Sequence, residues 1–264
     1  MSAERHTPSG VDLGLAGAVV LITGGARGVG AGIAGVLNGL GAVPVICGRT
    51  APDPNESGFD FHPCDVRDSG AVSAMIAAIV AKHGRIHGVV NNAGGSPFAL
   101  AADASDNFAR KIVELNLVAP LVVARAAHAV MSTQPGGGAI VNVSSVSGHR
   151  PSPGTSAYGA AKAGLDNLTQ SLAVEWAPAV RINSVVCGPV QTELSHLHYG
   201  DDDGIAAVGK TIPMGRLASP ADIGNAVAFL LSPLAAYVTG SALTVHGGGE
   251  KPAFLAAGNA DNRV

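Results

Sequence analysis

The stretch "LITGGARGVGAGIAGVL", residues 21–37, passes from an apolar run through a cluster of glycines into a helical pattern. Glycines permit a tight turn and let the backbone approach a phosphate closely. The start of the following helix offers free N–H groups and the positive end of the helix dipole. A glycine cluster alone is a weak signal in a chain with 36 glycines. Placed after an apolar strand and before a helix, it predicts a dinucleotide-binding turn.

Outward from this turn, short apolar runs alternate with longer helical patterns. Strands are predicted at 18–23, 42–47, 59–62, 86–91, 138–144, 181–187 and 241–245. Helices are predicted at 28–40, 68–83, 105–131, 156–177 and 219–231. Most of the strands are apolar on both faces, which is typical of parallel strands covered by helices. The alternation predicts an α/β fold: a single doubly wound parallel sheet of the Rossmann type, with about seven strands and helices on both faces.

The sequence shows no internal repeat and no linker long enough to divide it. We therefore predict a single domain over residues 1–264, with terminal extensions at 1–12 and 250–264. One connection is unusual: residues 49–65, "RTAPDPNESGFDFHPCD", hold three prolines and no helical period. This crossover is predicted to be a loop.

Composition limits the classes of function. The net charge of −3 gives no electrostatic footprint for nucleic acid. No apolar run reaches about 18 residues without a charge or a Gly/Pro break, so no membrane span is expected. The three cysteines, Cys47, Cys64 and Cys187, have no metal-ligand spacing and are interpreted as buried thiols in a reducing compartment. The start of the chain lacks the apolar core of a signal peptide. These features predict a cytoplasmic protein.

Tyr158 and Lys162 lie four residues apart in a predicted helix and so share one face. A phenol has an ordinary pKa of about 10, and a nearby ammonium group favours the phenolate and lowers that pKa. The pair therefore suggests a tyrosine that works as an acid or base at neutral pH. The alternative interpretation is a surface tyrosine beside a solvated lysine, and the pair alone does not decide between them.

Several motifs stand together in order along the chain: Thr-Gly-x-x-x-Gly-x-Gly at 23–30, "NNAG" at 91–94, Asn116, Ser145 and Tyr158-x-x-x-Lys162. This ordered set resembles the short-chain dehydrogenase/reductase family, in its short single-domain branch, over residues 13–249. The resemblance implies that Tyr158 exchanges a proton with the substrate oxygen and that Ser145 fixes that oxygen. It implies that Lys162 lowers the pKa of Tyr158 and holds the nicotinamide ribose, and that Asn116 kinks a helix and passes a proton relay.

The resemblance also implies a nicotinamide cofactor. Its binding residues would be Gly24, Arg27, Gly28, Val29, Gly30, Arg49, Asp65, Val66, Asn91, Asn92, Ala93, Gly94, Tyr158, Lys162, Gly188, Val190 and Thr192. Gly48 stands where enzymes that use NAD often carry an acidic residue for the adenosine ribose. Arg49 and Arg27 instead suit a 2′-phosphate, so NADP(H) is favoured over NAD(H). Two departures from the family pattern are Cys187, where proline is usual, and His246, where an acidic residue is common.

Residues 193–212 occupy the position of the family's substrate lid, where His196, His198 and Tyr199 could contact substrate. The two histidines have no evident third ligand, so no metal is expected. The expected substrate is a small ketone or secondary alcohol, and 3-oxoacyl compounds are one class of such ketones. The helix patterns at 105–131 and 156–177 are apolar around much of their circumference. The resemblance implies that these two helices pair across a twofold axis, so a homotetramer is expected. The alternatives are an NAD-dependent alcohol dehydrogenase of the same family, a non-catalytic NADP-binding sensor, and a sugar-nucleotide epimerase or dehydratase.

Overall fold

The computed structural model describes residues 12–52 and 58–257. Within these residues seven parallel strands form one sheet, in the order β3-β2-β1-β4-β5-β6-β7. The strands are β1 (Val19–Thr23), β2 (Val43–Gly48), β3 (Asp60–Pro63), β4 (Gly88–Asn91), β5 (Gly138–Ser145), β6 (Val180–Cys187) and β7 (Ala242–Val245). The prediction of a doubly wound parallel sheet is confirmed, and each strand lies within a few residues of its predicted range.

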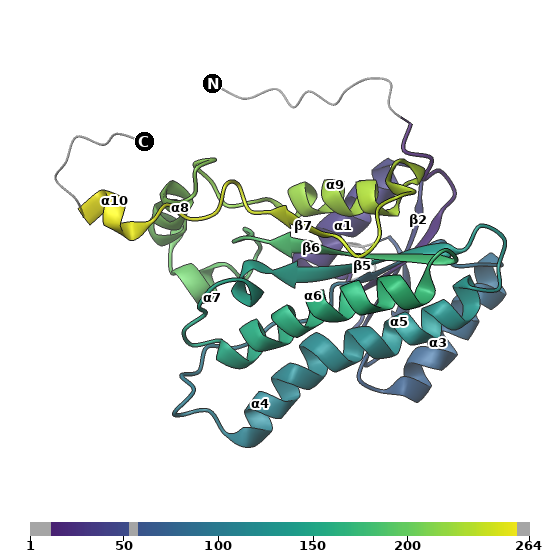
Figure 1. Ribbon diagram of the computed structural model, residues 1–264, viewed down its shortest axis with the longest axis horizontal. Helices are drawn as coiled ribbons and strands as arrows, with labels where there is room; N and C mark the ends of the chain where they lie inside the picture. The colour runs from purple at the N-terminus through teal and green to yellow at the C-terminus, as the bar shows by residue number, and fades with distance from the viewer. Residues whose placement is uncertain (1–11, 53–57, 258–264) are drawn as a thin grey trace.

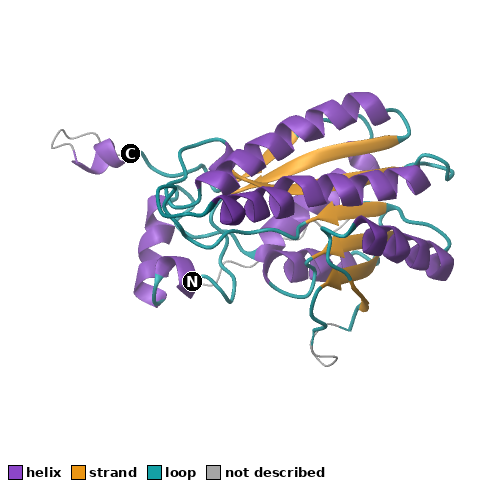
Figure 2. Cartoon of the chain, turned by 90° about the horizontal axis from the view of Figure 1, so that it is seen from below, coloured by secondary structure: helices purple, strands orange, loops and turns teal. Residues whose placement is uncertain are grey.

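Helices cover both faces of the sheet. One face carries α1 (Gly28–Gly39) and α9 (Pro220–Leu231), and the other carries α3 (Ser69–His83), α5 (Ala119–Met131) and α6 (Ser156–Trp176) (Figure 1). Figure 2 shows the strands side by side with helices packed across them. Successive side chains of a strand point to opposite faces, so Leu21 enters the core under α3 and α5 while Ile22 enters the core under α1 and α9. Both cores need apolar residues, which is why the strands are apolar on both faces.

The helix predicted over 105–131 is interrupted. It consists of α4 (Asp106–Val113), a π-helical turn η1 (Glu114–Val118) and α5. By length and mean hydropathy (1.4) the run Asp106–Met131 would be long and apolar enough to cross a membrane. In this fold it is a covering helix, because Val123, Ala127 and Met131 are buried against the sheet.

The predicted lid contains two helices, α7 (His196–Tyr199) and α8 (Asp202–Thr211). The predicted C-terminal extension contains the short helix α10 (Ala253–Ala257), and Glu250 just before it forms an ion pair with Arg150 at 2.6 Å. In the crossover after β2, residues 49–52 and 58–59 are not helical, and 53–57 lie outside the described residues. The extension predicted at 1–12 lies outside them too, except for its last residue, and so do residues 258–264.

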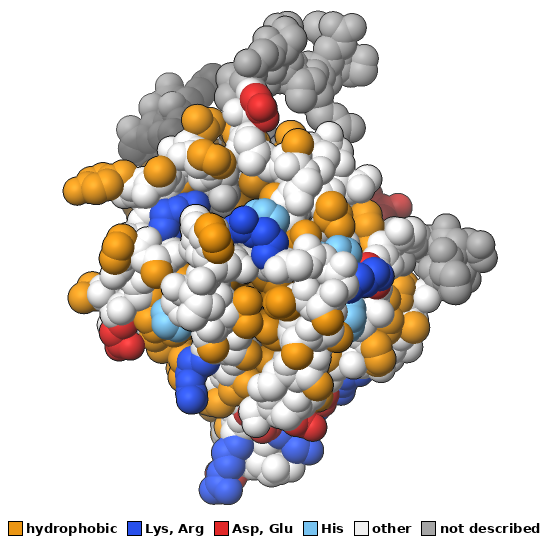
Figure 3. All heavy atoms as spheres, turned by 90° about the vertical axis from the view of Figure 1, so that its right-hand side faces the viewer, with side chains coloured by type: hydrophobic (Ala, Val, Ile, Leu, Met, Phe, Trp, Pro, Cys, Tyr) orange, Lys and Arg blue, Asp and Glu red, His pale blue; other side chains and the backbone are white. Residues whose placement is uncertain are grey.

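The remaining elements are two short 3-10 turns, η2 (Val146–Gly148) and η3 (Pro233–Ala235). Figure 3 shows the face at the right of Figure 1, away from α7 and α8. Basic and acidic side chains are interspersed there among apolar ones, in keeping with the small net charge of the chain.

Candidate active site

A cavity of about 810 Å³ opens at the carboxyl ends of the strands. This is where ligands bind in doubly wound sheets, because the loops that follow neighbouring strands diverge there. The cavity brings together most of the residues predicted from sequence: Gly24, Arg27, Gly28, Val29, Arg49, Asp65, Val66, Asn92, Ala93, Gly94, Ser145, Tyr158, Lys162, Gly188, Val190 and Thr192. Three predicted residues are buried and do not line the cavity: Gly30, Asn91 and Asn116.

The glycine-rich turn connects β1 to α1 and has the conformation that a phosphate site requires. Gly24 and Gly28 have φ values of +65° and +55°, which side chains rarely adopt. A Cβ on Gly30 would clash with the carbonyl oxygen of Gly24 and lie 2.6 Å from the amide nitrogen of Asn92. Helix α1 begins at Gly28 without a side-chain cap on its first N–H groups. The cradle therefore fits a pyrophosphate.

The "NNAG" segment braces this turn. The hydroxyl of Thr23 accepts hydrogen bonds from the backbone N–H groups of Asn92 (3.0 Å) and Ala93 (2.9 Å). The Asn92 side chain donates in return to the carbonyl oxygens of Thr23 (2.9 Å) and Gly24 (3.2 Å). Asn91 points elsewhere and donates to Asn142 at 2.9 Å. Asn91 is thus a structural residue of the sheet, while Asn92 and Ala93 hold the turn.

Ser145, Tyr158 and Lys162 meet at the inner end of the cavity. Ser145 ends β5, and its hydroxyl accepts from the N–H of Ser147 at 3.1 Å. Tyr158 and Lys162 lie one turn apart on α6, with the Lys162 Nζ 5.6 Å from the centre of the tyrosine ring. The Lys162 side chain is 3% exposed and donates to the carbonyl oxygen of Val143 at 2.7 Å.

The pKa values differ from the prediction made for this pair. Burial raises the pKa of Tyr158 to about 12, and the neighbouring Ser145 hydroxyl offsets only part of that rise. Burial lowers the pKa of Lys162 to about 8. The pKa of Tyr158 is therefore raised overall, so the prediction that it is lowered is wrong in its direction. The physical reason is that both groups are withdrawn from water and the ammonium is bonded to Val143.

Asn116 lies in the π-helical turn η1 and is fully buried. Its amide oxygen accepts from the N–H of Gly95 at 2.8 Å, and its amide nitrogen donates to the carbonyl oxygens of Gly95 and Ile112, both at 2.9 Å. These bonds fix the loop after β4 to the interrupted helix, which agrees with the predicted kink. The proton relay through Asn116 stays a prediction.

The outer end of the cavity is basic. Arg27 and Arg49 line it and are both exposed. Sequence reasoning missed Arg67, which also lines it and binds Asp65 through two hydrogen bonds, at 2.9 and 2.6 Å. These bonds lower the pKa of Asp65 to about 2. The sequence did contain a signal for this ion pair, because Asp65 and Arg67 stand two residues apart just after β3.

The lid contributes Glu193, Leu194, His198 and Tyr199 to the cavity wall. His198 and Tyr199 were predicted, Glu193 and Leu194 were not, and the ring of His196 lies instead against the carbonyl oxygen of Glu193 at 3.0 Å. Cys187, at the end of β6, faces the same cavity, and burial raises the pKa of its thiol to about 12. Over residues 12–52 and 58–257 no group of three His, Cys, Asp or Glu side chains could hold a metal ion.

Comparison with known proteins agrees with this geometry. Residues 24–250 match the family described as enoyl-(acyl carrier protein) reductase. The chain is 35% identical over 241 residues to an uncharacterized short-chain type dehydrogenase/reductase, y4vI of Sinorhizobium fredii, covering 88% of this chain and 43% of that protein. It is 33% identical over 250 residues to the 3-oxoacyl-[acyl-carrier-protein] reductase FabG of Chlamydia muridarum, covering 86% of this chain and 95% of FabG.

A solved structure is also similar. The ligand-free aldohexose dehydrogenase of Thermoplasma acidophilum superposes with a TM-score of 0.85 at 30% identity, covering 96% of this chain and all of that one. Fold and site together define the class of protein, a Rossmann-type oxidoreductase built for a nicotinamide cofactor. The chain belongs to the short-chain dehydrogenase/reductase family.

Proposed function

We propose that this protein is an NADP(H)-dependent oxidoreductase that moves a hydride between nicotinamide and a ketone or secondary alcohol. The observation that supports it most is that Ser145, Tyr158 and Lys162 line the same cavity as the glycine-rich turn. A dinucleotide on that turn would reach along the cavity toward the three side chains. The bound nicotinamide supplies or accepts the hydride.

The side chains have distinct roles in this proposal. Tyr158 donates a proton from its hydroxyl to the substrate oxygen during reduction and takes one during oxidation. A phenol whose pKa burial has raised to about 12 holds that proton at neutral pH. Ser145 donates a hydrogen bond to the same oxygen and keeps it near Tyr158. Lys162 places a positive charge beside the phenol, and Asn116 holds the wall of the site through Gly95.

The preference for NADP(H) rests on charge at the outer end of the cavity. Arg27 and Arg49 are exposed there, and β2 ends in Gly48 rather than in a carboxylate. A 2′-phosphate would form charge-assisted hydrogen bonds with the guanidinium groups. Asp65, which the family resemblance assigns to the adenine amino group, is paired with Arg67 at the same end.

The substrate is proposed to be a ketone, with 3-oxoacyl compounds as the first class to test. The Chlamydia relative is a 3-oxoacyl reductase by name, whereas the Thermoplasma structure is an aldohexose dehydrogenase. The lid residues Leu194, His198 and Tyr199 mix apolar and polar surface over the inner cavity.

The decisive experiment is to incubate the purified protein with NADPH or NADH and a panel of ketones, 3-oxoacyl thioesters and aldohexoses, and to follow nicotinamide absorbance. Faster turnover with NADPH and a ketone supports the proposal. Turnover with NADH alone would favour an NAD-dependent alcohol dehydrogenase. Tight cofactor binding without turnover of any carbonyl or alcohol would favour a cofactor sensor.

We further propose a homotetramer in the cytoplasm. Large apolar side chains are exposed on the helices and near the last strand, notably Val118, Val174, Leu234 and Tyr237. The three cysteines are buried free thiols in the structure, as predicted. Light scattering at micromolar concentration should give the mass of a tetramer, and a monomer mass would contradict the assembly.

A further inference from the structure

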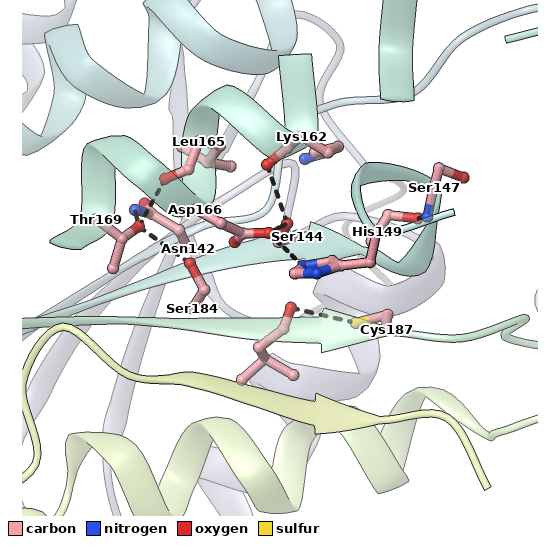
Figure 4. A network of polar contacts seen from close by, with 12 residues as sticks. Asn142, Ser144, Ser147, His149, Lys162, Leu165, Asp166, Thr169, Ser184 and Cys187 are labelled. Carbon is pink, nitrogen blue, oxygen red and sulfur yellow. Dashed lines mark hydrogen bonds and ion pairs between the residues drawn. The ribbon is translucent and has the colours of Figure 1, made fainter. Parts of the chain in front are cut away.

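A buried carboxylate sits beside the proposed catalytic residues without being one of them. Asp166 lies on α6 one turn after Lys162, and it is only 6% exposed. One of its oxygens, Oδ2, accepts a hydrogen bond from the Ser144 hydroxyl at 2.8 Å and lies 2.9 Å from Nε2 of His149. Figure 4 shows these two side chains converging on Asp166 from β5 and from the turn that follows it.

A buried carboxylate is costly unless it is paired, so its presence calls for a reason. Its other oxygen, Oδ1, is buried and has no hydrogen-bond partner among the described residues. The basic side chains near it are Lys162 on its own helix and His149 from the loop. Because a carboxylate only accepts hydrogen bonds, Nε2 of His149 must carry the hydrogen in this contact.

The contacts form a row between α6 and β5. On the strand, Asn142 donates to Thr169 at 2.8 Å and Ser144 donates to Asp166. These strand residues are two apart and these helix residues are three apart, which places each set on one face. Lys162 adds the bond to the carbonyl oxygen of Val143. Strand and helix are therefore held at a fixed register next to the reacting groups.

Ser144 has a direct geometric link to Ser145. The two are consecutive at the end of β5: the Ser144 hydroxyl bonds to Asp166 on α6, and Ser145 lies beside Tyr158 in the cavity. Because one peptide bond joins them, a shift of the strand backbone at Ser144 also moves Ser145. The turn η2 is held at both ends. At its start the Ser145 hydroxyl accepts from the N–H of Ser147, and at its end His149 contacts Asp166.

We propose that Asp166 is a positioning residue, which with Ser144 and His149 fixes the Ser145 turn against the helix that carries Tyr158 and Lys162. Asp166 touches neither cofactor nor substrate in this role. The inference rests on the proposed function for its effect on turnover. We call the contacts of Asp166 with Ser144 and His149 the brace. The brace is a property of the fold, so its presence can be measured without an activity assay.

The test compares two variants of the full-length protein with a control. Asp166→Ala removes the acceptor shared by Ser144 and His149. Asp166→Asn keeps a side chain of the same shape with one acceptor oxygen, and it removes the charge. Asp103→Asn alters an exposed carboxylate outside the network and serves as the control. Each protein is measured for kcat with NADPH and the best ketone, for NADPH affinity by fluorescence titration, and for hydrogen exchange of the peptide covering residues 144–152.

Asp166→Ala should lower kcat by about 10- to 100-fold, the scale expected when a reacting group is misplaced by about 1 Å. NADPH affinity should stay the same, and hydrogen exchange at 144–152 should become faster. Asp166→Asn and Asp103→Asn should remain close to the wild type in all three measurements. If Asp166→Ala does not fold, His149→Ala replaces it, since the side chain of His149 is 51% exposed.

Wild-type kcat and exchange in Asp166→Ala would overturn the proposal. An equal loss of kcat in Asp166→Ala and Asp166→Asn, with unchanged exchange, would also overturn it, because charge rather than position would then matter. If the wild type turns over no carbonyl at all, the proposed function fails, and the exchange measurements still decide whether the brace exists.

Discussion

The Nζ of Lys162 donates to the carbonyl oxygen of Val143 at 2.7 Å, while it stands 5.6 Å from the centre of the Tyr158 ring. The lysine is thus held by the strand and not by the tyrosine. Removing the phenol and removing the ammonium should therefore have different consequences.

Tyr158→Phe should lose most of kcat and keep NADPH affinity. The substitution removes the proton that the substrate oxygen needs, and general acid–base help contributes roughly 10²–10⁴-fold. Steady-state kinetics and cofactor titration check both parts. Asp103→Asn is the control, since Asp103 is exposed and outside the cavity. Near-normal turnover by Tyr158→Phe would exclude the proposed mechanism.

Lys162→Met should abolish activity and yet stabilise the cofactor-free protein at pH 7. Burial lowers the pKa of Lys162 from 10.5 to about 8. A pKa change of this size corresponds to about 3 kcal/mol. Losing the bond to Val143 offsets about 1 kcal/mol, which leaves a net gain of about 2 kcal/mol.

The sign of this effect depends on pH. The folded-state pKa lies below the unfolded value, so the cost of burying the charge is complete below about pH 8 and disappears as the pH rises towards 10.5. Urea unfolding of both proteins at pH 7 and pH 10.5 measures it. The stability advantage of the variant should shrink at the higher pH. A wild type that is the more stable protein at pH 7 would contradict the assignment.

Arg49→Ala should weaken NADPH binding by about one to two orders of magnitude, because a charge-assisted hydrogen bond contributes roughly 1.5–3 kcal/mol. NADH binding should change little. Gly48→Asp should go further and favour NADH, by repelling the phosphate and accepting from the 2′-hydroxyl. A Cβ at Gly48 would make only ordinary contacts, the nearest at 3.8 Å, so the fold tolerates it.

Fluorescence titration of each variant with both cofactors measures this preference. Arg125→Ala is the control, because Arg125 is exposed on α5 and is not part of the cavity lining. Tighter binding of NADH than NADPH by the wild type would show that Arg27 and Arg49 do not serve a phosphate.

Two glycines of α1 should respond in opposite ways to alanine. Gly30→Ala places a Cβ against the Gly24 carbonyl and 2.6 Å from the Asn92 amide nitrogen, so it should destabilise by about 1–3 kcal/mol and weaken cofactor binding. Gly35→Ala meets no described atom within 4 Å and should stabilise by about 0.5–1 kcal/mol. Thermal unfolding and NADPH titration compare the two. A Gly30→Ala protein that binds NADPH normally would refute the close packing of the turn.

The sheet and most of the cavity could be predicted from the sequence because their signals are local. Apolar runs such as 18–23 report burial on both faces, and the glycine cluster reports backbone that must turn tightly. The local pattern did not show the π-helical turn at Asn116, where only the family resemblance indicated a kink, because Asn116 bonds to Gly95, a partner 21 residues away. The hydrogen bond between Ser144 and Asp166 also joins residues far apart in the sequence, 22 positions, so no local pattern predicts it.

The directions of the pKa shifts of Tyr158 and Lys162 also could not be predicted from the sequence. Their spacing predicts a shared helix face, which α6 confirms, but the direction of each pKa shift depends on how far the surrounding side chains exclude water. Helix periodicity gives a shared face and says nothing of the desolvation of that face.

The position of β1 between β2 and β4 has a consequence for biosynthesis. As the chain leaves the ribosome, β2 and β3 emerge soon after β1 and can pair on one side of it. The other edge, Val20 to Ile22, stays open until Gly88 to Val90 have been translated. An open apolar edge is a template for pairing with other chains. A nascent chain arrested before β4 should therefore aggregate or recruit a chaperone, and a stable fragment of this protein has to extend past that strand.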